Sequence, residues 1–138
     1  MIAYLDSSVP LRIFLGQRHG WDRWGRWKQA YSSALMRLEC RRVVDRLRLE
    51  GALDDHGVAD AGAEIRRLDR IVGRVALTPS VLDRASMPMP TVVKTLDAVH
   101  LATALLLRER RHADLVFVTH DDQQATAARA LGFECLPG

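Results

Sequence analysis

The chain has 138 residues, of which 48% are hydrophobic, and it carries a formal net charge of +3 at pH 7. This composition excludes a disordered chain and predicts one domain spanning residues 1–138. The two cysteines, Cys40 and Cys135, lie far apart and outside any paired spacing, which argues against a disulfide framework or a zinc site. We expect no signal peptide and no membrane span, and hence a soluble cytoplasmic protein.

Short apolar segments alternate with helical patterns along the whole chain. The apolar segments are hydrophobic on both faces, which is typical of a parallel sheet covered by helices on both sides. We therefore predict an α/β fold with three layers, α/β/α, around a central parallel sheet. The expected elements begin with a strand at 2–5, helices at 9–15 and 21–27, a short extended segment at 30–33, and helices at 35–49 and 58–72. They continue with a strand at 74–78, helices at 81–85 and 95–107, a strand at 114–119, a helix at 121–131 and a strand at 133–136.

Several of these helices carry signals at their ends. Ser8 is a suitable N-cap for the first helix, and Gly16 is its stop. Thr95 can cap the helix that begins there, while Gly132 closes the last helix. Gly25 partly breaks the short helix at 21–27.

The helix from Thr95 to Leu107 carries one acid in an unusual place. Its apolar surface is suited to a core and consists of Leu96, Val99, Leu101, Ala104 and Leu105. Asp97 stands on the side of that surface shared by Leu101 and Ala104, where a carboxylate is costly to desolvate. An acid in the first turn also suits the helix dipole, so Asp97 alone leaves a local and a functional role open.

Three further acids lie at or near the carboxyl ends of predicted strands. Asp6 directly follows the first strand, Asp121 follows a later strand by two positions, and Glu39 lies one turn into the helix that begins at residue 35. Ligands of open α/β sheets bind at such ends, where the strand order reverses. Taken singly, Asp6 fits a turn or a cap, and Asp121 fits an N-cap. Glu39 taken singly fits an ion pair with Arg42 or Arg46.

Together the four acids indicate a site for a hard cation. Several carboxylates on one rim repel one another unless their pKa values rise or a cation lies between them. An all-oxygen set suits Mg²⁺, with Mn²⁺ as the alternative, better than it suits zinc. Such ions commonly serve to hydrolyse phosphodiester bonds, because they activate a water and screen charge in the transition state.

The segments that contain these acids resemble the PIN-domain family, and within it the VapC-type toxin ribonucleases of bacterial type II toxin–antitoxin systems. The matching segments run in order from Tyr4 to Gln123 and are YLDSS, SSALMRLECRR, KTLDAVHLATAL and VFVTHDDQ. The resemblance implies a small PIN-like α/β/α domain with Mg²⁺-dependent endoribonuclease activity on RNA. It also implies a cognate antitoxin and, commonly, a homodimer.

Position by position, the resemblance places the catalytic and metal-binding quartet of the family on Asp6, Glu39, Asp97 and Asp121. Ser7 and Thr119 match hydroxyl residues that would orient carboxylates or water. The segment HDD offers two aspartates, of which the T-x-D spacing favours Asp121 for the site and leaves Asp122 as the helix cap.

Histidines and arginines surround the acids in the sequence. Because the resemblance places only carboxylates in the site, we expect no catalytic part for His100 or His120, which flank the acids. Arginines crowd the helix of Glu39, where a solvated helix face, contact with an RNA backbone and pairing with an antitoxin are all compatible with the pattern.

The first two short helices carry more apolar side chains than a covering layer of their length needs. We expect an exposed groove for the antitoxin there, formed by Leu11, Phe14, Leu15, Trp21, Trp24 and Trp27. The tryptophans could instead belong to the core or stack on RNA bases. An arginine of the antitoxin would suit the nearby carboxylates best, because its planar fork binds them with two hydrogen bonds.

Two other functions compete with a nuclease. A PIN-like module could bind RNA or a protein without cutting it, although the intact quartet argues against this. A signalling receiver domain needs a phosphoacceptor aspartate after a middle strand and a lysine at a later strand end, and VALTPS and VFVTHDD supply neither. The chain also lacks GxGxxG and GxxxxGK[ST], so nothing supports a dinucleotide site or a P-loop.

Overall fold

A parallel sheet forms the centre of the computed structural model, which describes residues 1–15 and 23–137. Its strands are β1 (Ile2–Leu5), β2 (Gln29–Ser33), β3 (Gly73–Val75), β4 (Val116–Thr119) and β5 (Glu134–Pro137). They lie in the order β3-β2-β1-β4-β5, and each neighbouring pair is parallel. In the central strand, Tyr4 is opposite Tyr31 on one side and Phe117 on the other.

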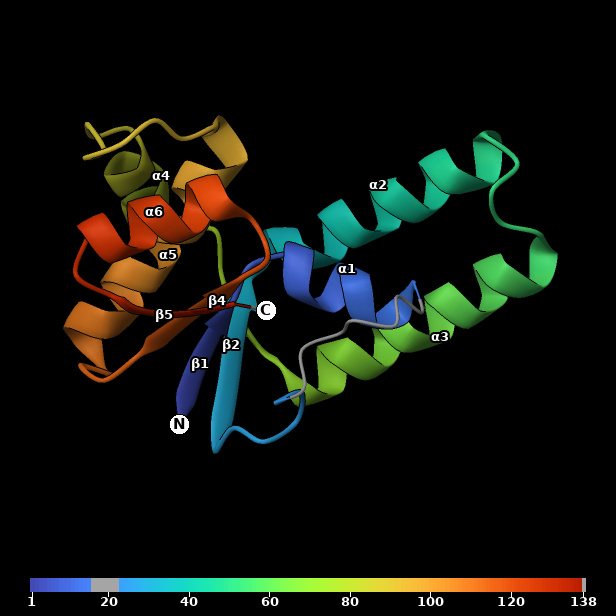
Figure 1. The fold of residues 1–138 in the computed structure, drawn as a ribbon, viewed down its shortest axis with the longest axis horizontal. Helices are drawn as coiled ribbons and strands as arrows, with labels where there is room; N and C mark the ends of the chain where they lie inside the picture. Colours follow the sequence, from blue (N-terminus) through green and yellow to red (C-terminus); the bar gives the residue numbers. More distant parts are fainter. Residues whose placement is uncertain (16–22, 138) are drawn as a thin grey trace.

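Helices cover both faces of this sheet (Figure 1). They are α1 (Ser8–Phe14), α2 (Leu35–Leu49), α3 (Asp55–Ile71), α4 (Pro79–Ala85), α5 (Thr95–Arg110) and α6 (Asp122–Ala130). The first three helices lie on one side, where α2 and α3 pack together as an arm that extends beyond the sheet, and the last three lie on the other side. The predicted three-layer α/β/α fold is therefore confirmed.

Each central strand contributes side chains to two separate cores. In β1, Ala3 and Leu5 pack with the α1–α3 layer, whereas Tyr4 between them packs with the α5–α6 layer. In β4, Val118 packs with the α1–α3 layer and Phe117 packs with the α5–α6 layer. Successive side chains of a strand point to opposite faces, so a strand between two helical layers must be apolar on both.

The helix α5 is the most deeply enclosed of the helices. Every residue from Ala98 to Leu105 is buried, because α5 lies between the sheet and α4. Its apolar surface begins later than predicted, since Leu96 is 47% exposed. Asp97, which follows it, is half-buried at the edge of this enclosed segment.

The strand order reverses between β1 and β4, and the carboxyl end of this pair of strands is named the crevice. The chain passes from β1 to β2 and β3 on one side of β1, and then crosses back to β4 on its other side. Crevices at such a reversal, outside the carboxyl ends of the strands, are where α/β sheets bind ligands. Asp6 directly follows β1 and Asp121 follows β4, so both acids lie at this end.

The predicted tryptophan helix is wrong in the part that the structure describes. Residues 23–28 form turns and bends, and Gly25 has a φ of 79°, a left-handed conformation that does not continue a right-handed helix. The rings of Trp24 and Trp27 meet edge to face with their centroids 5.0 Å apart. Trp21 and Gly16 lie outside the described residues.

Two helix starts also differ from prediction. Thr95 is the first residue of α5 rather than its cap, and Lys94 before it makes no capping hydrogen bond through its side chain. Ser7 rather than Ser8 holds the capping position of α1, and Ser8 lies inside the helix. The hydroxyls of both serines make contacts with acidic side chains instead.

The two cysteines are free, as expected, with Cys40 buried and Cys135 half-buried. Burial, together with the negative charges of Glu39 and Asp69, raises the pKa of Cys40 to about 12, so its thiol is protonated. Within the described ranges, no helix combines the length and the hydrophobicity needed to cross a membrane.

Candidate active site

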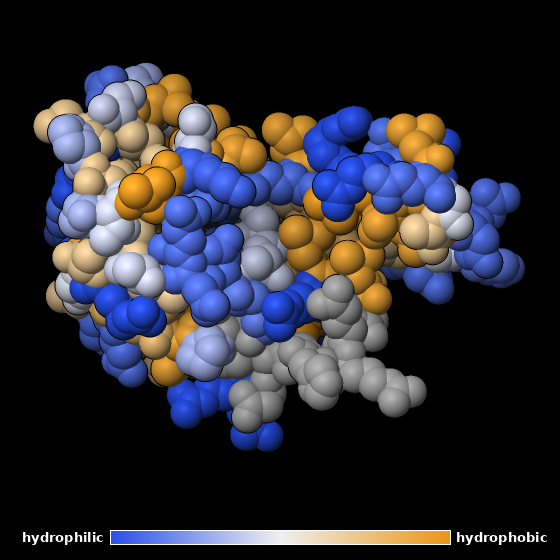
Figure 2. Space-filling view, turned by 45° about the horizontal axis from the view of Figure 1, so that its top comes forward, coloured by the Kyte–Doolittle hydropathy of each residue, from blue (hydrophilic) through white to orange (hydrophobic). Residues whose placement is uncertain are grey.

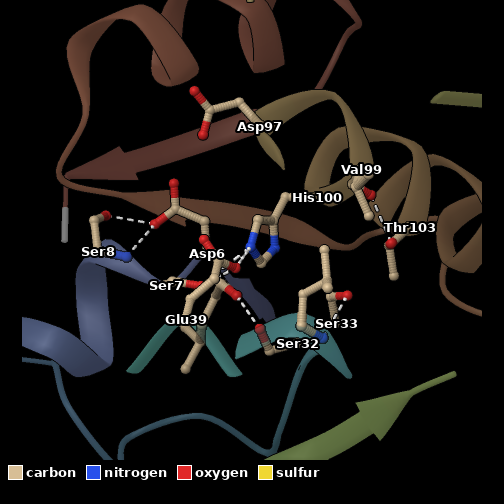
Figure 3. Close-up of polar contacts among 12 residues, drawn as sticks. Asp6, Ser7, Ser8, Ser32, Ser33, Glu39, Asp97, Val99, His100 and Thr103 are labelled. Carbon is tan, nitrogen blue, oxygen red and sulfur yellow. Dashed lines mark hydrogen bonds and ion pairs between the residues drawn. The ribbon is translucent and has the colours of Figure 1, made fainter. Parts of the chain in front are cut away.

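Side chains from three parts of the chain meet near the carboxyl ends of β1 and β4. Figure 3 shows Asp6, Glu39 and His100 gathered together, with Asp97 above them on the same helix as His100. Asp6 belongs to the turn after β1, Glu39 to α2, and Asp97 and His100 to the first turns of α5. The fold thus brings together acids that are up to 91 residues apart in the sequence (residues 6 and 97).

Asp6 is the most deeply buried of the four acids, with 4% of its surface exposed. Its Oδ1 atom accepts hydrogen bonds from the backbone N–H of Ser8, at 3.0 Å, and from the Ser8 hydroxyl. Its Oδ2 atom accepts one from the Thr119 hydroxyl. Burial raises the pKa of Asp6, and the hydrogen bonds from Ser8 and Thr119 partly offset that rise.

Glu39 is held by two side chains on other elements. Its Oε1 atom accepts a hydrogen bond from Ser7 Oγ at 2.7 Å and lies 2.7 Å from His100 Nε2. The predicted alternative, an ion pair with Arg42 or Arg46, is wrong. Each of these arginines pairs instead with an acid three or four residues further along the chain, since the guanidinium groups lie 3.2 Å from Asp45 and 3.9 Å from Glu50.

The charges of the other three acids affect the pKa of Asp97. Its pKa is raised, first by burial and then by the negative charges of Asp121, Asp6 and Glu39. Like charges raise a carboxyl pKa only when they lie near one another. The four acids therefore share one electrostatic environment, although no described arginine or lysine lies within ion-pair distance of any of them.

Asp121 has a structural function besides its place at the crevice. Its Oδ1 atom accepts a hydrogen bond from the backbone N–H of Gln124 at 3.0 Å and so caps α6. The expectation that Asp122 is the cap is therefore wrong, because Asp122 is the first residue inside the helix. The Oδ2 atom of Asp121 accepts no hydrogen bond from the described part of the chain, which leaves it available for a ligand.

A PIN domain model matches residues 3–130 and so covers nearly the whole chain, including all four acids. The chain belongs to the PIN domain family. A relative named ribonuclease VapC46, from Mycobacterium tuberculosis, is 35% identical over 134 residues, which are 94% of this chain and 92% of the relative. Ribonuclease VapC47 of the same species is 27% identical over 137 residues, with the same two shares covered.

The fold is similar to that of solved structures of low sequence identity. A toxin–antitoxin complex from Klebsiella pneumoniae contains a chain that is 17% identical to this PIN domain, with a TM-score of 0.66. The match covers 97% of this chain and 95% of that one. At this identity the likeness concerns the fold, and it agrees with the α/β/α layers described above.

Both hydroxyl residues predicted to orient the acids of this PIN domain contact them. Ser7 donates to Glu39, as described, and Thr119 contacts two acids. The Thr119 Oγ1 atom donates to Asp6 and accepts the backbone N–H of Asp121 at 3.0 Å.

The sequence prediction missed three residues that hold the acids. The Ser8 hydroxyl donates to Asp6 and accepts the backbone N–H of His120 at 2.9 Å, which joins the ends of β1 and β4. The side-chain amide of buried Gln124 donates to the backbone oxygen of Asp97 at 3.0 Å. His100 contacts Glu39 directly. Only His100 had a visible signal, because it lies three residues after Asp97 and therefore on the same side of α5.

The donor chemistry of this PIN domain suits a hard divalent cation. The acids offer only oxygen, the ligand atom that Mg²⁺ and Mn²⁺ prefer, and the pKa of Asp97 is raised by burial and then by the negative charges of its acidic neighbours. As the side chains stand, no three acidic, histidine or cysteine groups in the described ranges converge on a single metal position.

The residues predicted for an antitoxin groove lie mostly against a core of the PIN domain. Leu11, Phe14, Trp24 and Trp27 are half-buried and pack on the core of the α1–α3 layer. Leu15 is also half-buried. Part of their apolar surface therefore serves the fold, and their groove stays a prediction. Figure 2 shows hydrophobic surface on this side of the molecule, next to the polar residues of α2.

Proposed function

We propose that this PIN domain is an endoribonuclease of the VapC type, the toxin of a toxin–antitoxin pair, which hydrolyses RNA phosphodiester bonds with Mg²⁺ or Mn²⁺. The observation that carries the proposal is the gathering of the four acids at the carboxyl ends of β1 and β4. Thr119 there contacts both Asp6 and the backbone of Asp121, and Gln124 joins α6 to the backbone of Asp97. The names of the relatives, both ribonucleases, agree with it. The cytoplasm, where RNA is found, is the place of action that we infer.

The four acids would hold the cation, and the remaining polar residues would hold the acids. Bound Mg²⁺ would supply a Lewis acid that activates a water and balances charge on the scissile phosphate. Ser8 and Thr119 fix both oxygens of Asp6, so its carboxylate is already placed before a ligand arrives. Ser7 and His100 bind only the Oε1 atom of Glu39, so its Oε2 atom is left for the site.

The balance of charge explains why such a site would need its metal to act on RNA. Four carboxylates repel a phosphodiester, which is itself an anion. The neutral form that burial and neighbouring acids favour at Asp97 is a poor ligand and a poor base. A cation in the crevice removes both obstacles, because it favours the ionised acid and attracts the phosphate.

The test is cleavage of RNA by the purified chain. Fluorogenic RNA oligonucleotides and cellular RNA would be incubated with Mg²⁺, with Mn²⁺ or with EDTA. We expect cleavage with either metal, none in EDTA, and none with Asp97→Asn. Asp60→Asn, which changes an exposed acid on α3, is the matched control and should cleave like the parent. RNA binding without cleavage would overturn the proposal in favour of a non-catalytic binding module.

We also infer an antitoxin partner and a homodimer. A solved structure with the same fold is a toxin–antitoxin complex, and the crevice here offers uncompensated negative charge to a basic side chain. Coexpression with the product of the neighbouring reading frame, followed by size-exclusion chromatography with light scattering, tests both inferences. A chain that elutes alone as a monomer under these conditions would contradict them.

A further inference from the structure

His100 connects three segments of the chain through its ring nitrogens. The side chain is 1% exposed and lies in α5, one turn after Asp97. Its Nδ1 atom lies 2.9 Å from the Tyr4 hydroxyl of β1. Its Nε2 atom lies 2.7 Å from Glu39 Oε1 of α2 and 3.1 Å from the Ser7 hydroxyl (Figure 3).

The contact with Glu39 determines which ring nitrogen carries a proton. An ionised carboxylate only accepts hydrogen bonds, so the 2.7 Å contact requires a proton on Nε2 of His100. On the other side of the ring, Tyr4 is fully buried and its phenol keeps its proton, because burial raises its pKa well above the ordinary value. A buried O–H needs an acceptor, and Nδ1 is within reach.

The result is a directed chain of hydrogen bonds from the sheet to the crevice. Tyr4 donates to Nδ1, and Nε2–H then donates to Glu39 Oε1. Ser7 donates to the same oxygen of Glu39, so two donors hold Oε1. No described residue donates to Oε2, and the carboxylate is thereby held with one oxygen free.

We propose that His100 is a positioning residue for Glu39 and that Tyr4 in turn orients the ring of His100. This relay presents Glu39 Oε2 to the divalent cation of the site. The inference rests on the proposed function for its metal. A histidine that only fills the core would satisfy Tyr4 equally well, but it would have no reason to contact a half-buried carboxylate at the crevice. Residues that orient metal ligands in this way typically change metal affinity or activity by about 10–100-fold when they are lost.

Two amide substitutions at His100 test the contributions of its two ring nitrogens separately. In His100→Gln the amide nitrogen takes the place of Nε2 and restores the donor to Glu39, whereas in His100→Asn it takes the place of Nδ1 and reaches only Tyr4. The primary measurement is the affinity of the metal-free protein for Mn²⁺, by isothermal titration calorimetry. We expect His100→Asn to lose about tenfold or more of this affinity and His100→Gln to recover most of it.

The chain provides a matched control in a second tyrosine–histidine pair. The Tyr31 hydroxyl lies 3.1 Å from His112 Nε2, and within the described part of the chain neither residue hydrogen-bonds to any of the four acids. His112→Asn should therefore leave the Mn²⁺ affinity unchanged. Circular dichroism and thermal melting of every variant would establish that each is folded before its affinity is compared.

A second measurement does not depend on any substitution at His100. Two-dimensional ¹H–¹⁵N NMR of histidine-labelled protein reports which ring nitrogen is protonated, and we expect His100 with the proton on Nε2. Tyr4→Phe removes the donor to Nδ1, and we expect it to weaken Mn²⁺ binding less than His100→Asn does. This variant keeps the proposal testable if the substitutions at His100 prevent folding.

The outcomes separate this inference from the proposed function. Equal Mn²⁺ affinities for His100→Asn and the parent, with weak binding by Glu39→Gln, would overturn the role of His100 and leave the metal site standing. A proton on Nδ1 alone would overturn it as well, as would unchanged Mn²⁺ binding by Glu39→Gln. A parent protein that binds Mn²⁺ through this relay but cleaves no RNA would contradict the nuclease proposal only.

Discussion

The hydroxyl of Thr119 at the end of β4 donates to the buried carboxylate of Asp6 at the end of β1. The same oxygen accepts the backbone N–H of Asp121 at 3.0 Å, so one small side chain joins two acids of the crevice. The pairing of β1 with β4 sets this contact, because the register places Leu5 opposite Val118 and therefore brings the residues that follow side by side.

Thr119→Val should destabilise the protein, because it removes a donor from a buried carboxylate while keeping the shape of the side chain. We expect a loss of about 1–3 kcal/mol in the free energy of unfolding, measured by urea denaturation at neutral pH in EDTA. Thr126→Val is the matched control, since the exposed Thr126 hydroxyl bonds only to a backbone oxygen of its own helix. A loss no larger than that of the control would contradict the structural importance of the contact.

Asp97→Asn should make the metal-free protein more stable at neutral pH. The pKa of Asp97 is raised above 3.8, so in the folded state its ionised form is disfavoured by burial and by the charges of Asp121, Asp6 and Glu39. An amide of the same shape removes that cost. The measurement is the denaturation midpoint in EDTA at pH 7, and a midpoint below that of the parent would refute the prediction.

The stability of the metal-free protein should fall as pH rises. Asp6 and Asp97 have folded pKa values above their unfolded values, so the folded state binds more protons than the unfolded state between the two. The free energy of unfolding therefore decreases from about pH 4 upward through the raised values. Denaturation in EDTA from pH 4 to pH 8 would show this decline, and the decline should be smaller in Asp97→Asn. An equal slope in both proteins would exclude Asp97 as a contributor.

Divalent metal should reverse this loss at neutral pH. A ligand that binds only the folded state stabilises it by about 2.7 kcal/mol at a concentration one hundred times its Kd. We expect Mg²⁺ or Mn²⁺ to raise the melting temperature of the parent and to have little effect on Asp97→Asn. Melting curves that neither metal shifts would count against a metal site among these acids.

Trp24→Ala or Trp27→Ala should weaken binding of the antitoxin. Both side chains are only half-buried against the core, so each keeps surface that a partner could cover. Because each substitution also removes core contacts, Leu136→Ala is the control, since Leu136 is half-buried on the same core but outside the predicted groove. The measurement is the affinity of each variant for the antitoxin, determined on copurified complexes. If both tryptophan variants bind as tightly as the parent, the groove lies elsewhere.

The layers of this fold could be predicted because they depend on repeating patterns. Short segments apolar on both faces are typical of central strands, and β1 and β4 divide their side chains between two cores accordingly. The tryptophan segment shows where a pattern misleads. A spacing of three predicts a helix, but the left-handed Gly25 ends any helix there, and the residues form turns.

The four acids and the two hydroxyl residues beside them, Ser7 and Thr119, were within reach of sequence reasoning, but the other contacts that hold the acids were not. An acid after a strand can be read from its neighbours, whereas the partner of His100 is Tyr4, 96 positions earlier in the chain. Contacts of this kind depend on how elements pack. The capping of α6 by Asp121 rather than Asp122 was equally ambiguous, because both residues suit the end of a helix and a single backbone hydrogen bond separates them.

The burial of α5 limits the ways in which the activity of the proposed site could be blocked. Amide hydrogens from Ala98 to Leu105 lie in a segment that is buried throughout, so they should exchange with solvent only when the whole molecule opens. His100 lies within this slowly exchanging segment, so it should stay beside Glu39 for as long as the protein is folded. Local melting of this segment therefore offers no separate way to release Glu39. A regulator of the proposed site would act from outside, as a molecule that covers the crevice.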